Sequence, residues 1–266
     1  MTGTTGMTQA MATQRWIRFV HDGAVGFGTL TGEAIQVFEG DLFNAPRSTG
    51  ATLRLPDVKL LRPTEPGKVI ALYNNFRPWL DKLKVARPAE PLYFLKAPNA
   101  YLNPGETIPR PACDTRVIFE GELGIVIGRT AKNVSEAQAM DHVFGVTCAN
   151  DVTAVDVLPR DPSFAQWVRA KGFDGFCPFG PAIATGLDIG TLVLRSTLNG
   201  SPRQNFPMSD MLFGPAELVS RLSHDMTLKP GDIILCGTSV GVGVMKPGST
   251  IEIEVDGIGT LANRFG

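Results

Sequence analysis

The sequence predicts a mainly β fold with few helices, and three observations support this prediction. Short runs rich in β-branched and aromatic residues alternate with turns that contain glycine or aspartate from residue 15 onward. The segments after Ile183 repeat the pattern, as in LVLRSTLNG, DIILCG and STIEIEVDGIGTLANRF. Few segments have the spacing of an amphipathic helix, so the sequence excludes a regular doubly wound sheet of alternating strands and helices.

The order of these segments indicates a small domain followed by a large one. Residues 1–14 lack a basic region followed by an apolar core, so we expect a disordered polar tail rather than a secretory signal. Residues 15–62 predict a small β domain of short strands joined by glycine-rich turns. RPTEPGK, residues 62–68, is typical of a linker, so the larger domain is expected over residues 63–266.

Four segments of the larger domain predict short helices. FRPWLDKLKVARP is expected to begin a helix near Pro78 and to end it at Pro88. VSEAQAMDHVFG has Ser135 as its candidate N-cap residue. DPSFAQWVRAKG predicts another short helix, and SDMLFGPAELVSRLSHDMTLKPGD contains one with Leu218 and Leu222 facing inward.

Composition excludes several classes of function. The chain has 266 residues, of which 43% are hydrophobic, and a formal net charge of -1. No long charged run and no apolar stretch of membrane-spanning length occurs, so we expect neither nucleic acid nor a membrane as a partner. The four cysteines are scattered without a CxxC pair, which disfavours a zinc site or disulfides and predicts reduced thiols in the cytoplasm.

Three acidic residues form a candidate metal site. Glu120 and Glu122 lie in RVIFEGELGIVIGR, which predicts one long strand, and residues two apart share a face of a strand. Buried carboxylates need a nearby positive charge, and Asp151 in ANDVT could supply a third oxygen ligand for Mg²⁺, Mn²⁺ or Ca²⁺. Taken alone, the pattern fits a metal site no better than it fits a structural explanation. In that explanation the glutamates lie on a solvent-facing strand edge and Asp151 lies in an Asn-Asp turn.

Two further segments carry candidate chemistry. Lys171 lies among apolar and glycine neighbours, where it could face a cleft and move protons, although an ordinary surface lysine fits the same pattern. GTSVGVG, residues 237–243, is either a plain β-turn or a loop whose backbone N–H groups bind an anion. In the second case Thr238 would add a hydroxyl donor for a substrate carboxylate.

Several segments in a fixed order resemble the fumarylacetoacetate hydrolase family over residues 65–266. They are FEGELGIVIG, GVTCANDVTA, AKGFDGFCPFGP, LNGSPRQNFPMSDMLFGPAELVSRLS, MTLKPGDIILCGTSVGVG and GSTIEIEVDGIGTLANRF. The resemblance implies a β-sandwich roll, which periodicity alone does not predict, and a homodimer. It also implies that residues 63–266 form the catalytic domain.

The resemblance further implies the roles of individual residues. Glu120, Glu122 and Asp151 would hold a divalent metal, commonly Mg²⁺, while Lys171 matches the active-site lysine and Thr238 falls in the substrate-binding loop. Family substrates are 2-oxo or enol acids, often dicarboxylates from aromatic catabolism. A metal that such an acid chelates would stabilise the negative charge developed during cleavage, decarboxylation or tautomerisation.

The chain departs from the family pattern where many hydrolases carry NYxxHxxE. In NNFRPWLDK, Trp79 stands where the histidine would be and Lys82 where the glutamate would be. Val155 and Leu158 replace an arginine and a glutamine that often follow ANDVTA. Hydrolysis needs a base that activates water, whereas decarboxylation mainly needs an electron sink, so these changes favour decarboxylation or isomerisation.

IALYNNFRPWLDKL and LYFLKAPNAYLNPGETIP are similar to the homoprotocatechuate-pathway branch of the family. Members decarboxylate 5-oxopent-3-ene-1,2,5-tricarboxylate and isomerise 2-hydroxyhepta-2,4-diene-1,7-dioate. We expect Asn74, Asn75, Arg77 and Trp79 to line the entrance, with Arg77 pairing a distal carboxylate of the substrate. Two alternatives stay open: a C–C hydrolase of an acylpyruvate in which Asp81 or a metal-bound hydroxide replaces the base, and a non-catalytic paralogue.

Overall fold

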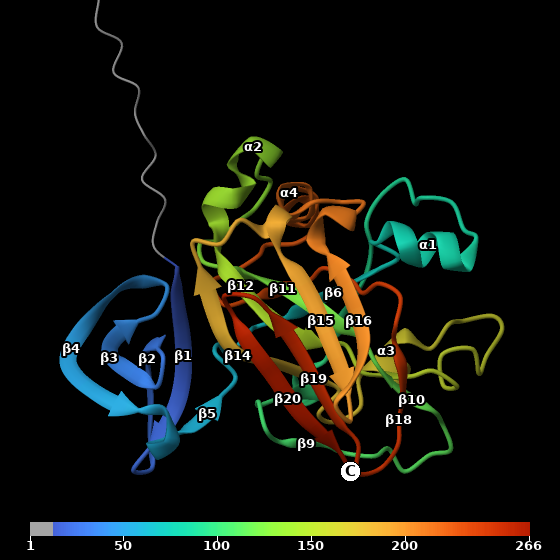
Figure 1. Ribbon diagram of the computed structural model, residues 1–266. Helices are drawn as coiled ribbons and strands as arrows, with labels where there is room; N and C mark the ends of the chain where they lie inside the picture. Colours follow the sequence, from blue (N-terminus) through green and yellow to red (C-terminus); the bar gives the residue numbers. More distant parts are fainter. Residues whose placement is uncertain (1–12) are drawn as a thin grey trace, which may run out of the picture.

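A computed structural model describes residues 13–266, so most of the expected tail lies outside the described residues. Strands dominate and the helices are short, which confirms the predicted mainly β class. Figure 1 shows a small lobe of β1 to β5, in blue, beside a larger lobe that holds the remaining elements.

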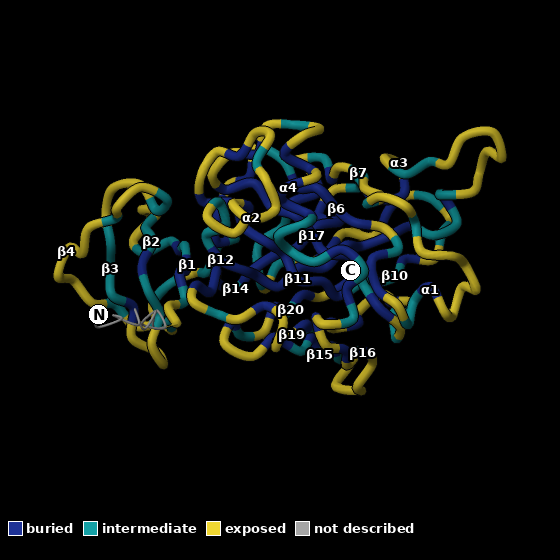
Figure 2. Tube along the Cα trace, turned by 90° about the horizontal axis from the view of Figure 1, so that it is seen from above, coloured by how far each residue is buried: buried dark blue, intermediate teal, exposed yellow. Residues whose placement is uncertain are grey.

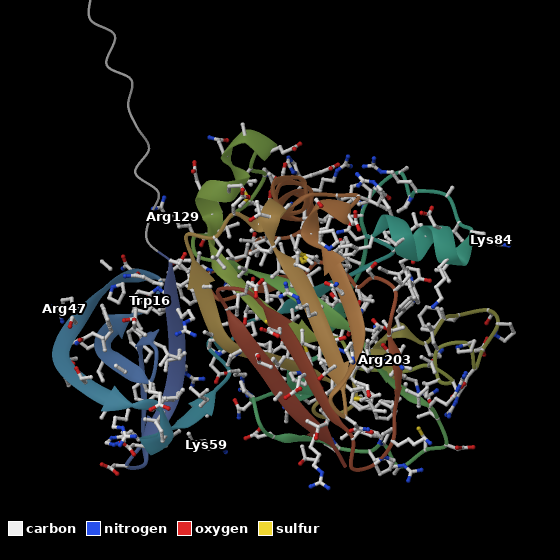
Figure 3. The ribbon with its side chains drawn as sticks, in the orientation of Figure 1. Trp16, Arg47, Lys59, Lys84, Arg129 and Arg203 are labelled. Atoms are coloured by element: carbon white, nitrogen blue, oxygen red, sulfur yellow. The ribbon has the colours of Figure 1, made fainter. Side chains whose placement is uncertain are left out.

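The small lobe is an antiparallel meander. Its strands are β1 (Gln14–His21), β2 (Ala24–Thr31), β3 (Ala34–Asp41), β4 (Asn44–Arg54) and β5 (Lys59–Leu61). Trp16 on β1, labelled in Figure 3, lies within this lobe. Its ring packs edge-on against Phe38, with ring centroids 4.9 Å apart. Because β1 pairs with β14 of the larger lobe as well as with β2, the two lobes share one continuous sheet.

This sheet forms the centre of the larger lobe, in the order β1-β14-β12-β11-β17-β6-β7. The new strands are β6 (Val69–Tyr73), β7 (Leu92–Lys96), β11 (Gly121–Ile127), β12 (Val143–Asn150), β14 (Cys177–Thr185) and β17 (Ile233–Leu235), with β8 (Tyr101–Leu102) beside β14. Every residue of β11 is buried, because the sheet is covered on both faces there.

A second sheet covers one face, with the order β16-β15-β19-β20-β9. Its strands are β16 (Ser201–Pro207), β15 (Val193–Leu198), β19 (Thr250–Val255), β20 (Gly259–Phe265) and β9 (Thr107–Ile108). The sheets approach closely at Gly121, where an added Cβ would lie 3.1 Å from Leu194 Cδ2. Figure 2 shows the buried residues, in dark blue, concentrated in the middle of the larger lobe.

The predicted single strand over RVIFEGELGIVIGR is two strands, so that prediction is wrong in detail. β10 (Val117–Phe119) ends before Glu120 and pairs with β13 (Thr153–Ala154) and β18 (Gly243–Met245) in a small sheet of its own. β11 belongs instead to the large sheet, where it pairs with β12. At the break the Glu120 carbonyl accepts from the backbone N–H of Asp151 at 3.0 Å. The glutamates therefore lie at a change of sheet.

The four helices of the described part of the chain all fall within predicted segments. They are α1 (Arg77–Leu83), α2 (Glu136–Ala139), α3 (Trp167–Lys171) and α4 (Pro215–Asp225), and 3-10 turns cover Leu55–Asp57, Pro98–Ala100, Met140–His142, Ile189–Thr191 and Met208–Asp210. Leu218 and Leu222 of α4 are buried as expected. Ser135 is the N-cap residue of α2, as predicted, but its hydroxyl donates to the Gln138 side chain and does not bond a backbone N–H of the first turn.

The helix α1 ends earlier than expected, because Lys84 takes a left-handed conformation with φ 56° before Pro88 is reached. Within residues 13–266, every helix is too short or too polar to cross a membrane.

Candidate metal centre

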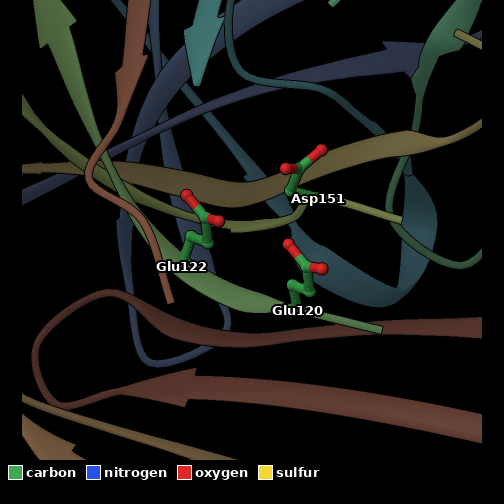
Figure 4. A group of neighbouring side chains, drawn as sticks. All are labelled: Glu120, Glu122 and Asp151. Atoms are coloured by element: carbon green, nitrogen blue, oxygen red, sulfur yellow. The ribbon is translucent and has the colours of Figure 1, made fainter. Parts of the chain in front are cut away.

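Three carboxylates converge where two neighbouring strands end. Glu122 is the second residue of β11, Glu120 lies just before that strand, and Asp151 follows β12. The two strands pair antiparallel with Gly121 opposite Asn150, which brings these positions together. One carboxylate oxygen from each acid lies within 4.8 Å of the other two. Figure 4 shows the three side chains gathered in one place.

Burial removes the alternative of a solvent-facing strand edge. Glu122 and Asp151 are each 1% exposed, whereas the side chain of Glu120 is 17% exposed. Glu120 is therefore the acid that a ligand entering from solvent would meet first. The structure brings together all three predicted ligands.

Two buried lysines surround Asp151. Lys171, the last residue of α3, donates to Asp151 Oδ2 and to Glu120 Oε2, the latter at 2.8 Å. Lys96, the last residue of β7, places Nζ 2.7 Å from Asp151 Oδ1. Sequence reasoning identified Lys171 but missed Lys96, for which the available signal was a lysine at the end of the apolar strand LYFLK.

These charges shift the pKa values of Asp151 and Lys171 in opposite directions. Burial alone would raise the pKa of Asp151, but the ammonium groups of Lys171 and Lys96 lower that pKa below its ordinary value. Burial alone would lower the pKa of Lys171, but the charges of Asp151 and Glu120 raise it. The ion pairs therefore stay charged when they are buried.

Glu122 has a different environment. Burial, followed by the negative charges of Asp151 and Glu120, raises the pKa of Glu122 well above its ordinary value. Among the described residues its recorded hydrogen-bond donor is the backbone N–H of Gly237, at 2.8 Å. The ionised form of Glu122 thus lacks a direct cationic partner among residues 13–266.

The three acids fit a divalent cation. Three carboxylates and two ammonium groups leave one formal negative charge in the cluster. The donors are hard oxygens, which suit Mg²⁺, Mn²⁺ or Ca²⁺. A cation beside Glu122 would supply the charge that its carboxylate lacks, so the donor set and its electrostatics agree with the predicted metal.

The loop GTSVGVG packs directly against the carboxylates. Gly237 has φ 88°, a conformation that favours glycine, and this presents its N–H to Glu122. The Thr238 hydroxyl donates to the Gly121 carbonyl at 2.8 Å and accepts from Gln204 Nε2 at 2.8 Å. Because the hydroxyl hydrogen of Thr238 is engaged, its role as a donor to substrate stays a prediction.

Gln204 is a second residue that sequence reasoning missed. Its Oε1 accepts from the Gly121 N–H at 3.0 Å while its amide reaches Thr238, so it joins the metal strand to the glycine-rich loop. It is buried on β16, in the second sheet. No local sequence signal marks it, because its partners lie far away in the chain.

The predicted entrance residues take varied positions. The buried side chain of Asn75 accepts from Phe213 N and donates to Cys236 O, both at 2.9 Å, and so ties two segments together. Arg77 donates to the Ser209 carbonyl at 3.2 Å. Asn74 is left-handed with φ 58°, and its buried Oδ1 lacks a partner among the described residues.

Trp79 is half-buried on α1, with Lys82 Nζ 5.2 Å from its ring centroid. Substrate contacts of these four residues stay predictions, since their recorded contacts are within the protein.

Comparison with known proteins agrees with this architecture. Residues 68–266 match the family model "Fumarylacetoacetate (FAA) hydrolase C-terminal", and residues 14–63 match "Rv2993c-like, N-terminal". Protein Rv2993c of Mycobacterium tuberculosis is 43% identical over 224 residues, which cover 83% of each chain.

Two solved structures are similar over almost the whole chain. The 2-hydroxyhepta-2,4-diene-1,7-dioate isomerase of Mycobacterium marinum is 40% identical with a TM-score of 0.86, covering 95% of this chain and 98% of its own. The 5-carboxymethyl-2-hydroxymuconate delta-isomerase of Mycobacterium smegmatis is 41% identical with a TM-score of 0.87, covering 94% and 98%. The chain belongs to the fumarylacetoacetate hydrolase family.

Proposed function

We propose that this protein is a divalent-metal-dependent isomerase or decarboxylase of a 2-oxo or enol dicarboxylate from aromatic catabolism. The observation that carries the proposal is the buried Lys171 ammonium, held between Glu120 and Asp151. Such a group can deliver a proton to a substrate carbon, which both reactions require. The similarity to two mycobacterial isomerases supports the same reaction class.

The acids and the lysines of the cluster have different roles in the proposed reaction. A divalent cation on Glu120, Glu122 and Asp151 would supply electrophilic stabilisation of negative charge on the 2-oxo group of a bound substrate. Lys171 holds a proton at Nζ, and Lys96 helps to keep Asp151 ionised. With the cation bound, the cluster changes from one formal negative charge to one positive charge, which favours an anionic substrate.

The α1 segment favours proton transfer over hydrolysis. Trp79 and Lys82 pack on each other there and offer neither an imidazole nor a carboxylate to activate water. Asp81 is the acidic residue of this helix, and it supports the alternative proposal of a C–C hydrolase acting on an acylpyruvate.

Turnover of three substrate types separates these proposals. The Mg²⁺-loaded protein should isomerise 2-hydroxyhepta-2,4-diene-1,7-dioate or release CO₂ from 5-oxopent-3-ene-1,2,5-tricarboxylate. Cleavage of acylpyruvates alone, with oxygen from labelled water entering a carboxylate product, would establish the hydrolase instead. Tight metal binding without turnover of any of these acids would indicate a non-catalytic paralogue.

We further propose a cytoplasmic homodimer. β7 is at one end of the large sheet, and its Leu92, Tyr93 and Leu95 are 41%, 37% and 46% exposed. An apolar strand at a sheet edge is a surface that proteins usually cover, and a second copy would cover it. Light scattering should give twice the chain mass, and a monomer at micromolar concentration would contradict the proposal.

The four free cysteines support a reducing compartment.

A further inference from the structure

A stack of aromatic rings lies behind Lys171. Phe94 and Lys96 are two apart on β7 and therefore share a face of the strand. Lys96 reaches Asp151, and Phe94 faces Lys171. Trp167 and Lys171 are the first and last residues of α3, four apart, so they lie on the same side of the helix.

The contacts in this stack are close. Lys171 Nζ lies 5.1 Å from the Phe94 ring centroid, within the usual range of a cation–π contact. The Phe94 and Trp167 rings stack at 5.2 Å with an interplanar angle of 21°, and Tyr73 meets Trp167 edge-on at 4.9 Å. The rings thus run without interruption from the ammonium group to the end of β6.

The stack also separates Lys171 from a neighbouring pocket. This pocket has a volume of about 510 Å³ and is lined by Tyr73, Pro91, Leu92, Tyr93, Phe94 and Trp167. No carboxylate or lysine of the metal centre lines it. The rings therefore form part of the wall between the pocket and the charged cluster.

We propose that Phe94, supported by Trp167, is a positioning residue that orients the Lys171 ammonium toward the substrate, an inference that rests on the role of Lys171 in the proposed function. A lysine side chain is flexible, and its contacts define its position. Glu120 and Asp151 hold the ammonium through two ion pairs. When the same carboxylates bind a cation, their attraction for Lys171 weakens, and the ring face is the contact that the cation leaves unchanged.

Phe94→Leu tests this proposal, because leucine stays apolar but has no ring. We expect kcat to fall about tenfold. KM and the Mg²⁺ affinity, measured by calorimetry, should stay within about twofold, because the metal ligands are untouched. Phe94→Tyr keeps a ring face and should restore kcat. Phe173→Leu is the matched control: Phe173 is close to α3 and pairs with Phe176 at 5.2 Å, but its ring makes no recorded contact with Lys171.

A direct structural readout does not depend on turnover. The ε-methylene protons of Lys171, assigned through a Lys171→Arg variant, should show a ring-current shift in NMR spectra of ¹³C-lysine-labelled protein. This shift should vanish in Phe94→Leu and persist in Phe94→Tyr and Phe173→Leu. If Phe94→Leu fails to fold, Trp167→Leu should reduce the shift and kcat together.

Unchanged kcat and an unchanged Lys171 signal in Phe94→Leu would overturn the positioning role. A fall in metal affinity equal to the fall in kcat would also overturn it, because Phe94 would then act through the metal site. Inactivity of the native protein on every oxo acid, with the ring-current shift present, would instead refute the proposed function and leave the contact itself established.

Discussion

Lys96 and Asp151 form an ion pair inside the protein, with Lys96 Nζ 2.7 Å from Asp151 Oδ1 and side chains that are 0% and 1% exposed. Removing one partner of a buried pair leaves an uncompensated charge, which usually costs about 3–5 kcal/mol. We expect Lys96→Met to lower the free energy of unfolding of the metal-free protein by about that amount, as measured by urea denaturation.

Lys59→Met is the control for this prediction. Lys59, labelled at the edge of the small lobe in Figure 3, pairs with Glu106 at 3.1 Å, but its side chain is 65% exposed. Exposed pairs contribute about 0–1 kcal/mol, so this variant should unfold close to the native midpoint. Equal midpoints for the two variants would contradict a stabilising role for the buried pair.

Glu122→Gln should abolish measurable Mg²⁺ binding and leave the fold intact. The amide oxygen can still accept from the Gly237 N–H, so the loop contact at 2.8 Å is preserved while the negative charge is lost. Removing a buried charge that lacks a cationic partner should also increase the free energy of unfolding of the metal-free protein. Each ~1 kcal/mol of added stability should raise its Tm by about 2–4 °C. Calorimetric titration and thermal melts measure the two effects, and unchanged metal affinity would refute the ligand assignment.

The raised pKa of Glu122 predicts how the metal-free protein responds to pH. The folded state binds a proton at Glu122 more tightly than the unfolded state does. The free energy of unfolding should therefore fall as pH rises from about 4.5 toward the raised pKa, and level off above it. Urea denaturation across this range should show the decline in the native protein and a weaker decline in Glu122→Gln; equal slopes would contradict the prediction.

Metal binding should release protons for the same reason. A cation competes with the proton on Glu122, so Mg²⁺ affinity should increase with pH until Glu122 is fully ionised. Calorimetry in two buffers of different ionisation enthalpy measures the number of protons released. A Mg²⁺ affinity that is independent of pH would show that Glu122 is already ionised before the metal binds.

Thr238→Val tests the hydrogen-bonded link behind the metal strand. The change removes the donor to the Gly121 carbonyl and the acceptor of Gln204 Nε2. We expect a loss of about 1–3 kcal/mol in the free energy of unfolding, because buried polar groups lose their partners. We also expect a higher KM. Thr238→Ser keeps the hydroxyl and should behave like the native protein in both urea denaturation and steady-state kinetics.

Local pattern in the sequence predicted much of the fold. Alternating and β-branched runs predicted the strands, and proline, glycine and apolar spacing located segments that contain the helices. The turn into α1 and the inward face of α4 follow from residues within those elements, so nearby sequence is sufficient to predict them. The acids Glu120, Glu122 and Asp151 were also recognised, with roles supplied by resemblance to a family.

Tertiary structure alone decided how that site is charged and supported. Lys96 reaches Asp151, Phe94 faces Lys171, and Gln204 binds the backbone N–H of Gly121 between the two glutamates, each from a strand that lies far from its partner in the sequence. The break at Glu120 likewise depends on β10 and β11 pairing with different strands. Pairing between distant strands leaves no periodic signal within either one. The sequence therefore identified the ligands. Packing determined that two buried lysines balance Asp151, while Glu122 has, within residues 13–266, only the backbone N–H of Gly237 as its hydrogen-bond donor.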